Sequence, residues 1–435
     1  MPVKRVQAWL LLGLYRLLSL VLSPLCLILL LVRLAQSKED PRRLGERLGW
    51  PSRRRPAGPL LWFHAASVGE LNSLLPVLRA LGQGAGAPVL LVTTVTRTAA
   101  ALAGRVLPPA AIHQYVPIDH WLALLPFRSY WRPCLGVLAE AELWPELVQA
   151  MPHLHLINAR MSQRSYLRHR RLPIYAGWLL AQVEVCLAQS QADAERFRRL
   201  GARDVRALGS TKLDADPPPL NSVYLEMVQQ VFAGRSVLLL ASSHAGEERQ
   251  WLEAWAENQL TQRPFGLLLA PRHPQRAQEV LAQARQQGLS AGLWSDLVGG
   301  GLAPNPDVLV ADVIGEMGTW ISAAAVVVMG GSFYPQGRAL GGQNPLEPVA
   351  LGCPVLCGPD MANFSDLLEP LLAAGCLQQC ADVAATLAAA LPLLVQPLPR
   401  GHGEGLRLRG PSQLLASLLL KRCRLSSAAN EMPMI

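Results

Sequence analysis

The sequence predicts an α/β protein with two doubly wound domains that follow an N-terminal apolar segment. Short apolar runs alternate with stretches of helical periodicity, which is typical of a parallel sheet with helices on both faces. A stiff, proline-rich break at Asp214–Pro219 interrupts this alternation, which then restarts. The chain has 435 residues, of which 51% are hydrophobic, enough for two or three domains of about 150 residues each.

The apolar segment runs from Val6 to Val32, is broken by Arg16 and Pro24, and is long enough to span a bilayer. No A-x-A cleavage site follows it, which argues against a secretory signal peptide. Because more basic residues follow the segment than precede it, the positive-inside rule predicts that the rest of the protein stays in the cytoplasm. Two arrangements stay open: the segment spans the membrane, or it lies in the interface with Arg16 reaching to the headgroups.

The net charge of +9 is unevenly placed, since residues 1–55 contain eleven Lys or Arg and only three acidic residues. A nucleic-acid-binding protein usually spreads basic residues through its fold, so we expect no nucleic-acid partner. The Lys and Arg residues between positions 33 and 55, here called the basic collar, instead suggest anionic membrane lipids as partners.

The eight cysteines are scattered, and two pairs, Cys353/Cys357 and Cys376/Cys380, have the spacing C-x3-C. A zinc site is one interpretation. However, Cys353 and Cys357 bracket a Pro-Val-Leu run typical of a buried strand, whereas zinc ligands usually lie on turns. Small buried thiols in a reducing compartment explain the pattern better, so we expect no metal site.

In the first domain, the stretch Leu60–Leu81 predicts a strand, a tight turn and a helix. Leu60–Phe63 is apolar, His64–Gly69 is small and polar, and leucines from Leu71 to Leu81 recur at helical spacing. Glu70 therefore starts a helix beyond the carboxyl end of a strand, where open α/β sheets bind ligands. A first-turn acid that only complements the helix dipole would look the same, so both interpretations stay open. Other strands are expected at 89–92, 135–138, 154–157 and 183–188, and a helix at 192–200.

Charged residues follow later strands of this domain. Glu140 and Glu142 lie two apart after a strand, and either face one side of an extended segment or form a solvated pair. Lys212 follows a strand that ends near Gly209, where a lysine would point into the space between the domains. Five arginines form a cluster: Arg160, Arg164, Arg168, Arg170 and Arg171. Such a cluster can bind phosphate groups, or it can be a solvated helix face.

In the second domain, small and polar residues gather at the carboxyl ends of expected strands. One such turn can simply reverse the chain or offer N–H groups to an anion, but several at one sheet edge predict a nucleotide-sized pocket. The sequence lacks the P-loop and Rossmann glycine motifs. The turns are Ala241–Glu247, Pro271–Pro274, Gly330–Ser332 and Gly341–Glu347. Strands are expected at 237–241, 266–270, 308–311, 325–329 and 355–357, and helices at 247–257, 275–287, 364–374 and 412–422.

Nine motifs occur along the chain in a set order. They are Gly45–Gly49 (GERLG), His64–Glu70 (HAASVGE), Glu140–Pro145 (EAELWP), Asn158–Arg160 (NAR), Lys212–Asp214 (KLD), Pro271–Pro274 (PRHP), Ile314–Glu316 (IGE), Gly330–Ser332 (GGS) and Asn344–Glu347 (NPLE). Together they resemble the bacterial Kdo transferases, which attach 3-deoxy-D-manno-octulosonic acid (Kdo) to lipid A precursors. The resemblance runs from about Gly45 to Gly375. It implies a GT-B glycosyltransferase with two Rossmann-like domains facing a cleft: an anchor at 1–35, an acceptor domain at 36–215, and a donor domain at 216–435 that includes the C-terminal helix.

The resemblance also implies transfer of Kdo from CMP-Kdo to lipid IVA, with inversion and without a cofactor, at the cytoplasmic face of the inner membrane. Glu70 would be the general base, and Glu140 and Lys212 would stabilise the transition state. The acceptor-binding candidates are Ser67, Gly69, Arg160 and Arg164. CMP contacts are expected from Pro271, Arg272, His273, Ile314, Gly315, Glu316, Asn344, Pro345, Leu346 and Glu347. Secondary donor-site candidates are Ser242, Ser243, Gly331 and Ser332.

One physical point opposes Glu70 as a base. A helix N-terminus stabilises the carboxylate anion, which lowers the pKa of the group and makes it a weaker base. Burial would counter this effect. The donor side also departs from the family pattern: Gln343 replaces a histidine, the loop Phe333–Leu340 is longer, and Ser242–His244 and Ile314–Met317 vary. Two other functions therefore stay open, a GT-B transferase that uses a UDP-sugar and a membrane-bound scaffold that has lost catalysis.

Overall fold

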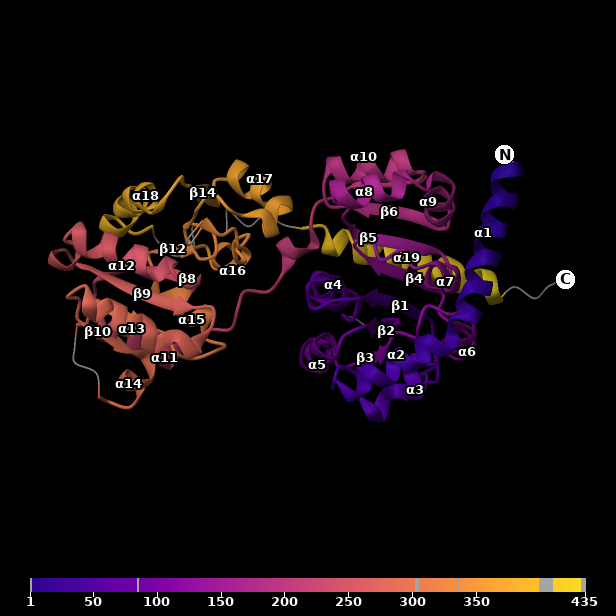
Figure 1. The fold of residues 1–435 in the computed structure, drawn as a ribbon, viewed down its shortest axis with the longest axis horizontal. Coiled ribbons are helices and arrows are strands. Elements are labelled where there is room, and N and C mark those ends of the chain that lie inside the picture. The colour runs from indigo at the N-terminus through magenta and orange to yellow at the C-terminus, as the bar shows by residue number, and fades with distance from the viewer. Residues whose placement is uncertain (1, 84–85, 302–304, 335–336, 399–409, 432–435) are drawn as a thin grey trace. The chain divides into compact units, whose positions relative to one another are not determined.

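The computed structural model describes residues 2–83, 86–301, 305–334, 337–398 and 410–431. Its contacts divide the chain into two compact units, one formed by residues 1–215 with 409–435 and one by residues 216–408 (Figure 1). Each unit contains one seven-stranded sheet in which all neighbouring strands are parallel. The α/β class with two doubly wound sheets is confirmed.

The first unit has the strand order β3-β2-β1-β4-β5-β6-β7. The order reverses between β1 and β4, and in such sheets ligands bind at the carboxyl ends of the strands that flank the reversal. The strands are β1 Leu60–Ala65, β2 Val89–Thr94, β3 Ala111–Tyr115, β4 Leu135–Ala139, β5 Leu154–Ala159, β6 Val183–Ala188 and β7 Val205–Ala207. The helices are α1 Pro2–Val21, α2 Ser23–Ala35, α3 Leu44–Arg47, α4 Val68–Leu81, α5 Arg97–Val106, α6 Trp121–Trp131, α7 Pro145–Ala150, α8 Gln163–Arg170, α9 Pro173–Leu180, α10 Gln191–Leu200 and α19 Ser412–Glu431.

Strand β1 is buried along its whole length and divides the first unit into two cores. Leu60 and Trp62 pack with α6, α7, α9 and α10, whereas Leu61 and Phe63 pack with α4, α5 and α19. Successive side chains of a strand point to opposite faces, so a continuous apolar run fits a strand covered on both sides. The leucines of α4 that recur at helical spacing are buried as predicted.

The N-terminal apolar segment forms two helices, α1 and α2, that bend by 58° at their junction. Among the described residues, no single helix is apolar and long enough to cross a membrane; Leu10–Val21 and α2 reach that length only as a bent pair. Helix α1 packs on α9. Arg16 does not reach outward as one of the two arrangements supposed, because its guanidinium makes two hydrogen bonds to Glu146, at 2.6 and 2.9 Å. The neighbouring Tyr15 hydroxyl donates to Asp119 at 2.7 Å.

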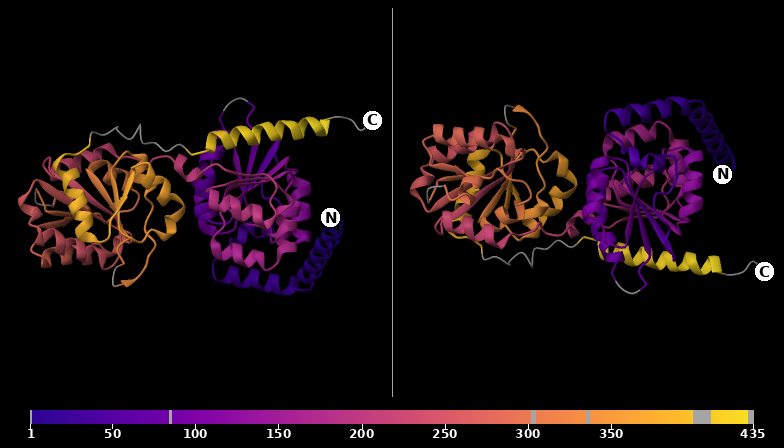
Figure 2. Two further views of the ribbon diagram at one scale, coloured as in Figure 1. Left: turned by 90° about the horizontal axis from the view of Figure 1, so that it is seen from above. Right: turned by 90° about the horizontal axis from the view of Figure 1, so that it is seen from below.

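The C-terminal helix α19 belongs to the first unit, not to the second domain where we expected it. It packs on α4 and β4 through Leu415 and Leu419, which are fully buried. Figure 2 shows α19 on one face of this unit and the α1–α2 segment on the opposite face. Its amphipathic pattern did not reveal which sheet it covers, because an apolar helix face fits either domain.

The second unit has the strand order β10-β11-β9-β8-β12-β13-β14, with the reversal between β8 and β12. The strands are β8 Ser236–Ser243, β9 Phe265–Pro271, β10 Ala291–Leu293, β11 Val308–Val310, β12 Val326–Met329, β13 Val355–Cys357 and β14 Leu377–Gln379. The helices are α11 Ser222–Val231, α12 Glu247–Glu257, α13 Ala277–Gln286, α14 Trp294–Val298, α15 Met317–Ala323, α16 Leu346–Ala350, α17 Ser365–Ala373 and α18 Val383–Val395. Five of these strands and three of these helices match the expected ranges within two residues at each end.

Candidate active site

Glu70 lies in the first turn of α4, directly beyond the carboxyl end of β1. Ser67 caps this helix, since its hydroxyl accepts from the Glu70 N–H at 3.2 Å and donates to Glu70 Oε1 at 3.0 Å. The Ala66 N–H donates to Glu70 Oε2 at 2.7 Å. These bonds resemble a capping box, although the carboxylate accepts from the residue before the N-cap, and they fix the carboxylate in one orientation. Glu70 is therefore both a helix-start acid and a positioned carboxylate.

Burial raises the pKa of Glu70 to about 7, because only 7% of this residue is exposed. The Ala66 N–H and the Ser67 hydroxyl lower the pKa, while the negative charges of Glu142 and Glu140 raise it. Desolvation thus exceeds the stabilisation that the helix start gives to the anion. A carboxylate with a pKa near neutrality suits a general base at physiological pH.

Glu140 and Lys212 meet at the same sheet edge. Glu140 follows β4, the strand beside β1, and its carboxylate lies 3.6 Å from the Lys212 ammonium. Glu140 has a φ of 54°, a left-handed conformation that is uncommon for a residue with a side chain. Backbone strain of this kind concentrates at functional sites. Two of the three predicted catalytic side chains are thus in contact, and the third is close enough that Glu140 raises its pKa.

Sequence reasoning gave no role to Asn158 and Asp214, which hold the turn that contains Lys212. Asn158 is buried at the end of β5, and its Oδ1 accepts from the Ser210 hydroxyl at 3.3 Å and the Thr211 N–H at 3.1 Å. Asp214 accepts from the N–H groups of Gly410 and Ser412 at 2.7 and 2.8 Å, which ties the Lys212 turn to the start of α19. The NAR and KLD motifs were the available signal, although only a structure reveals what their polar side chains bind.

The acceptor-binding candidates occupy different places on the first unit. Ser67 and Gly69 lie at the start of α4 beside Glu70. Arg160 follows β5 and is half-buried, whereas Arg164 is exposed on α8. Arg164, Arg168 and Arg171 recur at helical spacing, and none has an acidic partner among the described residues. They form an exposed basic helix face, which fits both a solvated face and a site for phosphate groups.

In the second unit, a cavity of about 140 Å³ lies at the carboxyl ends of the strands. Ser242 from β8, Arg272 after β9, and Asn344 and Glu347 at the start of α16 line it, with Gln343 between them. Met317 and Ile321 of α15 supply apolar surface. Burial raises the pKa of Glu347, while the Asn344 amide and the Arg272 charge lower it. The cavity combines one cation, one carboxylate and two amides, but the imidazole of His273, which we also expected there, does not line it.

Gln343, the residue that departs from the family pattern, bonds to His244 with 3.0 Å between Nε2 atoms. Burial lowers the pKa of His244, and the charges of His273, Arg272 and Arg276 add to this effect. A neutral His244 can accept the proton of the amide. The loop Phe333–Leu340 includes positions 335–336, which lie outside the described residues.

Several donor-side candidates do not line this cavity. Ser243 and Ser332 are fully buried, and their hydroxyls donate to Glu248 and to the Met329 carbonyl. Ile314 is 83% exposed, and the Glu316 carboxylate, directly before α15, accepts from the Thr319 hydroxyl at 2.9 Å. The remaining candidates outside the lining are Pro271, His273, Gly315, Gly331, Pro345 and Leu346.

Glu247 explains why the turns at this edge keep their shape, and sequence reasoning gave it no role. Its buried carboxylate accepts four N–H groups at 2.7–3.2 Å, from His244, Gly331, Ser332 and Phe333. Three of these N–H groups belong to the turns that we expected to bind an anionic ligand. An internal carboxylate occupies them instead, which corrects that expectation.

Comparison with known proteins shows to which family the chain belongs. A family model for 3-deoxy-D-manno-octulosonic-acid transferase (kdotransferase) matches residues 42–215. A 3-deoxy-D-manno-octulosonic acid transferase of Bordetella pertussis is 36% identical over 377 residues, covering 81% of this chain and 84% of that protein. The chain belongs to the Kdo transferase family.

This Kdo transferase also shares its fold with proteins of much lower identity. A putative UDP-N-acetylglucosamine 2-epimerase from Listeria monocytogenes is 13% identical with a TM-score of 0.53, covering 87% of this chain and 98% of that one. A glycosyltransferase from Rickettsia africae is 10% identical with a TM-score of 0.50, covering 87% and 100%. The fold is that of GT-B glycosyltransferases.

Proposed function

We propose that this enzyme transfers Kdo from CMP-Kdo to lipid IVA, a tetra-acylated and bisphosphorylated glucosamine disaccharide, with Glu70 as the general base. The observation that supports this most directly is a positioned carboxylate with a pKa near 7 at the reversal point of the first sheet, beside Glu140 and Lys212. Membership of the Kdo transferase family supports the transferred sugar.

In this proposal, Glu70 takes the proton of an acceptor hydroxyl as its oxygen attacks the anomeric carbon of Kdo. The bond between this carbon and the phosphate oxygen of CMP breaks, and attack from the opposite face inverts the anomeric centre. The departing phosphate is anionic, so the Arg272 guanidinium at the 140 Å³ cavity would stabilise it. The Lys212 ammonium, held by Glu140, would balance the negative charges of the reacting groups.

We further propose that the enzyme lies at the cytoplasmic face of the inner membrane, with α1 and α2 in the interface. Leu14, Leu25 and Leu29 are each more than half exposed. Tyr15 and Arg16 of α1 instead bind the domain, through Asp119 and Glu146. A helix with one face bound to the domain and one apolar face outward suits an interfacial position better than a span. The test is fractionation: Leu25→Glu/Leu29→Glu should release the protein from membranes, and retention of this variant would contradict the proposal.

The catalytic test mixes the protein with CMP-Kdo and lipid IVA and follows the product by mass spectrometry, which also counts the Kdo units added. Glu70→Gln should lower the rate about a hundredfold or more, because a positioned base contributes at least that factor. The matched control is Asp193→Asn. Asp193 accepts from the Ser190 hydroxyl at 2.6 Å at the start of α10, so it repeats the capping arrangement after another strand of the same sheet. Equal loss in both variants, or full activity of Glu70→Gln, would contradict the assignment.

Because the donor side departs from the family pattern, two other functions also need a test: a transferase that uses a UDP-sugar, and a scaffold that has lost catalysis. Competition between CMP and UDP separates Kdo transfer from the use of a UDP-sugar. Calorimetry with CMP tests whether the cavity in the second unit still binds a nucleotide, and Arg272→Ala should weaken that binding. Undetectable binding by the unmodified protein would favour a scaffold that has lost catalysis.

A further inference from the structure

A second cavity, of about 770 Å³, lies in the first unit along β3, the edge strand of the sheet. It is lined by the end of α5, by the start of β3 and by the segment that precedes β1. These parts lie toward the amino ends of the strands, whereas Glu70 and Glu140 follow the carboxyl ends. The cavity is therefore separate from the candidate active site.

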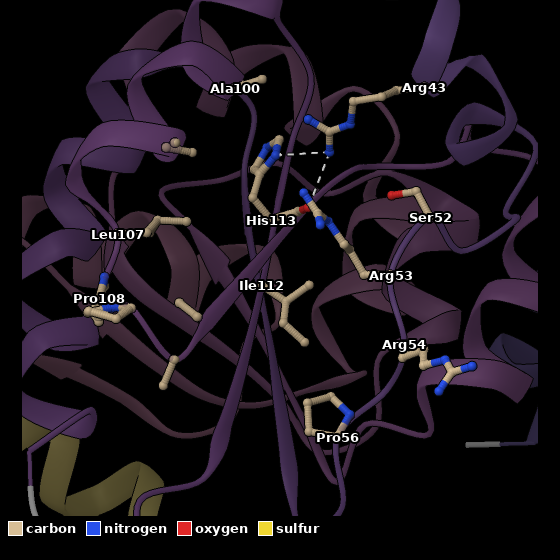
Figure 3. Close-up of a pocket in the computed structure, with 15 residues that line it drawn as sticks. Arg43, Ser52, Arg53, Arg54, Pro56, Ala100, Leu107, Pro108, Ile112 and His113 are labelled. Carbon is tan, nitrogen blue, oxygen red and sulfur yellow. Dashed lines mark hydrogen bonds between the residues drawn. The ribbon is translucent and has the colours of Figure 1, made fainter.

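The two sides of this cavity differ in chemistry. Ala100, Leu107, Pro108 and Ile112 form an aliphatic side, while Arg43, Arg53 and Arg54 with Ser52 form a basic side (Figure 3). No acidic residue is among the fifteen described residues that line it. Burial lowers the pKa of His113, which also lines the cavity, to about 3, so its ring is neutral.

In the described part of the chain, some arginines of the basic collar are paired with acidic side chains, and others are not. Arg33 and Arg47 pair with Glu39 at 2.8 and 2.9 Å. Arg43 pairs with Glu46 at 2.9 Å and also donates to the His113 ring. By contrast, Arg53 and Arg54 are exposed and have no acidic partner among the residues that the structure describes. Their charge is available to a ligand.

The backbone that carries Arg53 and Arg54 is held in place from both sides. The Tyr130 hydroxyl donates to the Arg53 carbonyl at 3.0 Å and accepts from the Arg55 N–H at 3.2 Å. The Arg55 guanidinium bonds the carbonyls of Trp131, Pro56 and Gly58 at 2.7–3.0 Å. Binding a ligand therefore orders two side chains but not the segment that presents them, which lowers the entropy cost.

We propose that this cavity binds a phosphate group that is attached to an apolar portion, with Arg53 and Arg54 bonding the phosphate and the aliphatic side contacting the apolar part. Arginine forks match the geometry of phosphate oxygens. An anionic phospholipid and a soluble phosphate ester share this chemistry. For the lipid, the inference rests on the proposed membrane location; for a soluble ester, it does not.

The experiment measures two kinds of binding with the full chain. Calorimetry with inorganic phosphate and glycerol 3-phosphate tests the soluble source. Sedimentation with vesicles tests the lipid source. The vesicles contain phosphatidylcholine alone or an equal mixture with phosphatidylglycerol. The affinity for the mixed vesicles is divided by the affinity for the neutral ones, which removes the apolar contribution of α1 and α2 because it is common to both. Replacing Arg53 and Arg54 by Ala should lower the preference for the anionic vesicles, or the affinity for the soluble esters, by about fivefold per arginine.

Two further variants separate a pocket from diffuse surface charge. A Cβ added at Gly104 on α5 would meet no atom within 4 Å, so Gly104→Trp should fill the cavity without disturbing the fold, and it keeps every charge. It should reduce binding as the double variant does. Arg105→Ala/Arg203→Ala removes two exposed arginines that do not line the cavity and should leave binding unchanged.

Three results would overturn the proposal: unchanged binding of both probes in the Arg53/Arg54 variant, an equal loss in the Arg105/Arg203 variant, or full binding by Gly104→Trp. Soluble esters that bind alone would identify a soluble ligand, and vesicles that bind alone would identify a lipid. Kdo transfer by these variants is measured separately, so failure of the proposed reaction and failure of this site give different results.

Discussion

At the scale of single residues, Glu70 is a helix-start acid that we also propose as the general base. Its capping bonds with Ser67 and Ala66 hold the side chain, and burial raises its pKa to about 7. The capping bonds alone would favour the anion and lower the pKa. The balance between these effects decides whether the carboxylate can act as a base near neutral pH.

The first prediction concerns the pH dependence of the rate. The base acts as the anion, so kcat/KM should rise tenfold per pH unit below about 7 and level off above it, following the pKa of Glu70. Steady-state rates between pH 5 and about 9 measure this profile. Asp193→Asn should show the same profile, and an acidic limb near the ordinary pKa of a glutamate would contradict our account.

The second prediction concerns stability. A carboxyl group whose pKa rises from 4.5 to about 7 on folding binds a proton more tightly in the folded state. Folding then loses stability as pH rises through this window. Glu70→Gln cannot ionise, so it should gain about 1–3 kcal/mol relative to the unmodified protein between pH 4 and pH 8. Urea denaturation at about pH 4 and pH 8 measures the free energy of unfolding of both proteins. If the difference between the two proteins were the same at both pH values, the pKa of Glu70 would not be raised.

At the scale of elements, hydrogen bonds from polar side chains fix the loops beside both candidate sites. Asn158 and Asp214 hold the turn with Lys212, while Glu247 accepts from three N–H groups of two turns in the second unit and from the Phe333 N–H. Gly330 allows these turns to meet, since a Cβ there would lie 2.6 Å from the Ser242 carbonyl oxygen. Rigid loops of this kind reduce the reorganisation that accompanies binding.

The third prediction tests Glu247. Glu247→Ala leaves four buried N–H groups without their acceptor, so the second unit should lose about 3 kcal/mol or more and bind CMP weakly. Glu257→Ala, on the same helix but exposed, is the control. Thermal unfolding and calorimetry measure the two effects. Unchanged stability of Glu247→Ala would show that other groups hold these turns.

At the scale of the whole molecule, the first unit is closed by segments from both ends of the chain. The α1–α2 segment and α19 lie on opposite faces of its sheet (Figure 2). Helix α19 starts at the Asp214 carboxylate and packs on α4, which carries Glu70. The C-terminus therefore supports the helix that positions the candidate base.

The fourth prediction follows from this packing. Asp214→Ala removes the acceptor of two N–H groups at the start of α19, which should cost about 1–2 kcal/mol. Hydrogen exchange should increase in α19 and α4. The matched control is Asp382→Ala, which removes an N-cap from α18 in the second unit and should leave exchange in α4 unchanged. If exchange in α4 changes only in the Asp382 variant, the assignment of α19 to the first unit is wrong.

Long apolar runs made much of the sheet predictable, whereas short edge strands were not. Strand β3 contains His113 and Gln114, so its sequence lacks a continuous apolar run. Its polar side chains bond to Arg43, Thr94 and the Trp50 carbonyl, partners that are distant in sequence. Short strands such as β10 and β14 give too few residues for a periodic signal.

The sequence by itself determined the α/β class, the family, and the position of Glu70 at a helix start beyond a strand. These features depend on local periodicity and on motifs that occur in order. Only the tertiary structure decided the raised pKa of Glu70, the capture of the donor-side turns by Glu247, the pairing of Arg16 with Glu146 and the place of α19. The physical reason is that burial and charge at one side chain are set by neighbours far away in the chain.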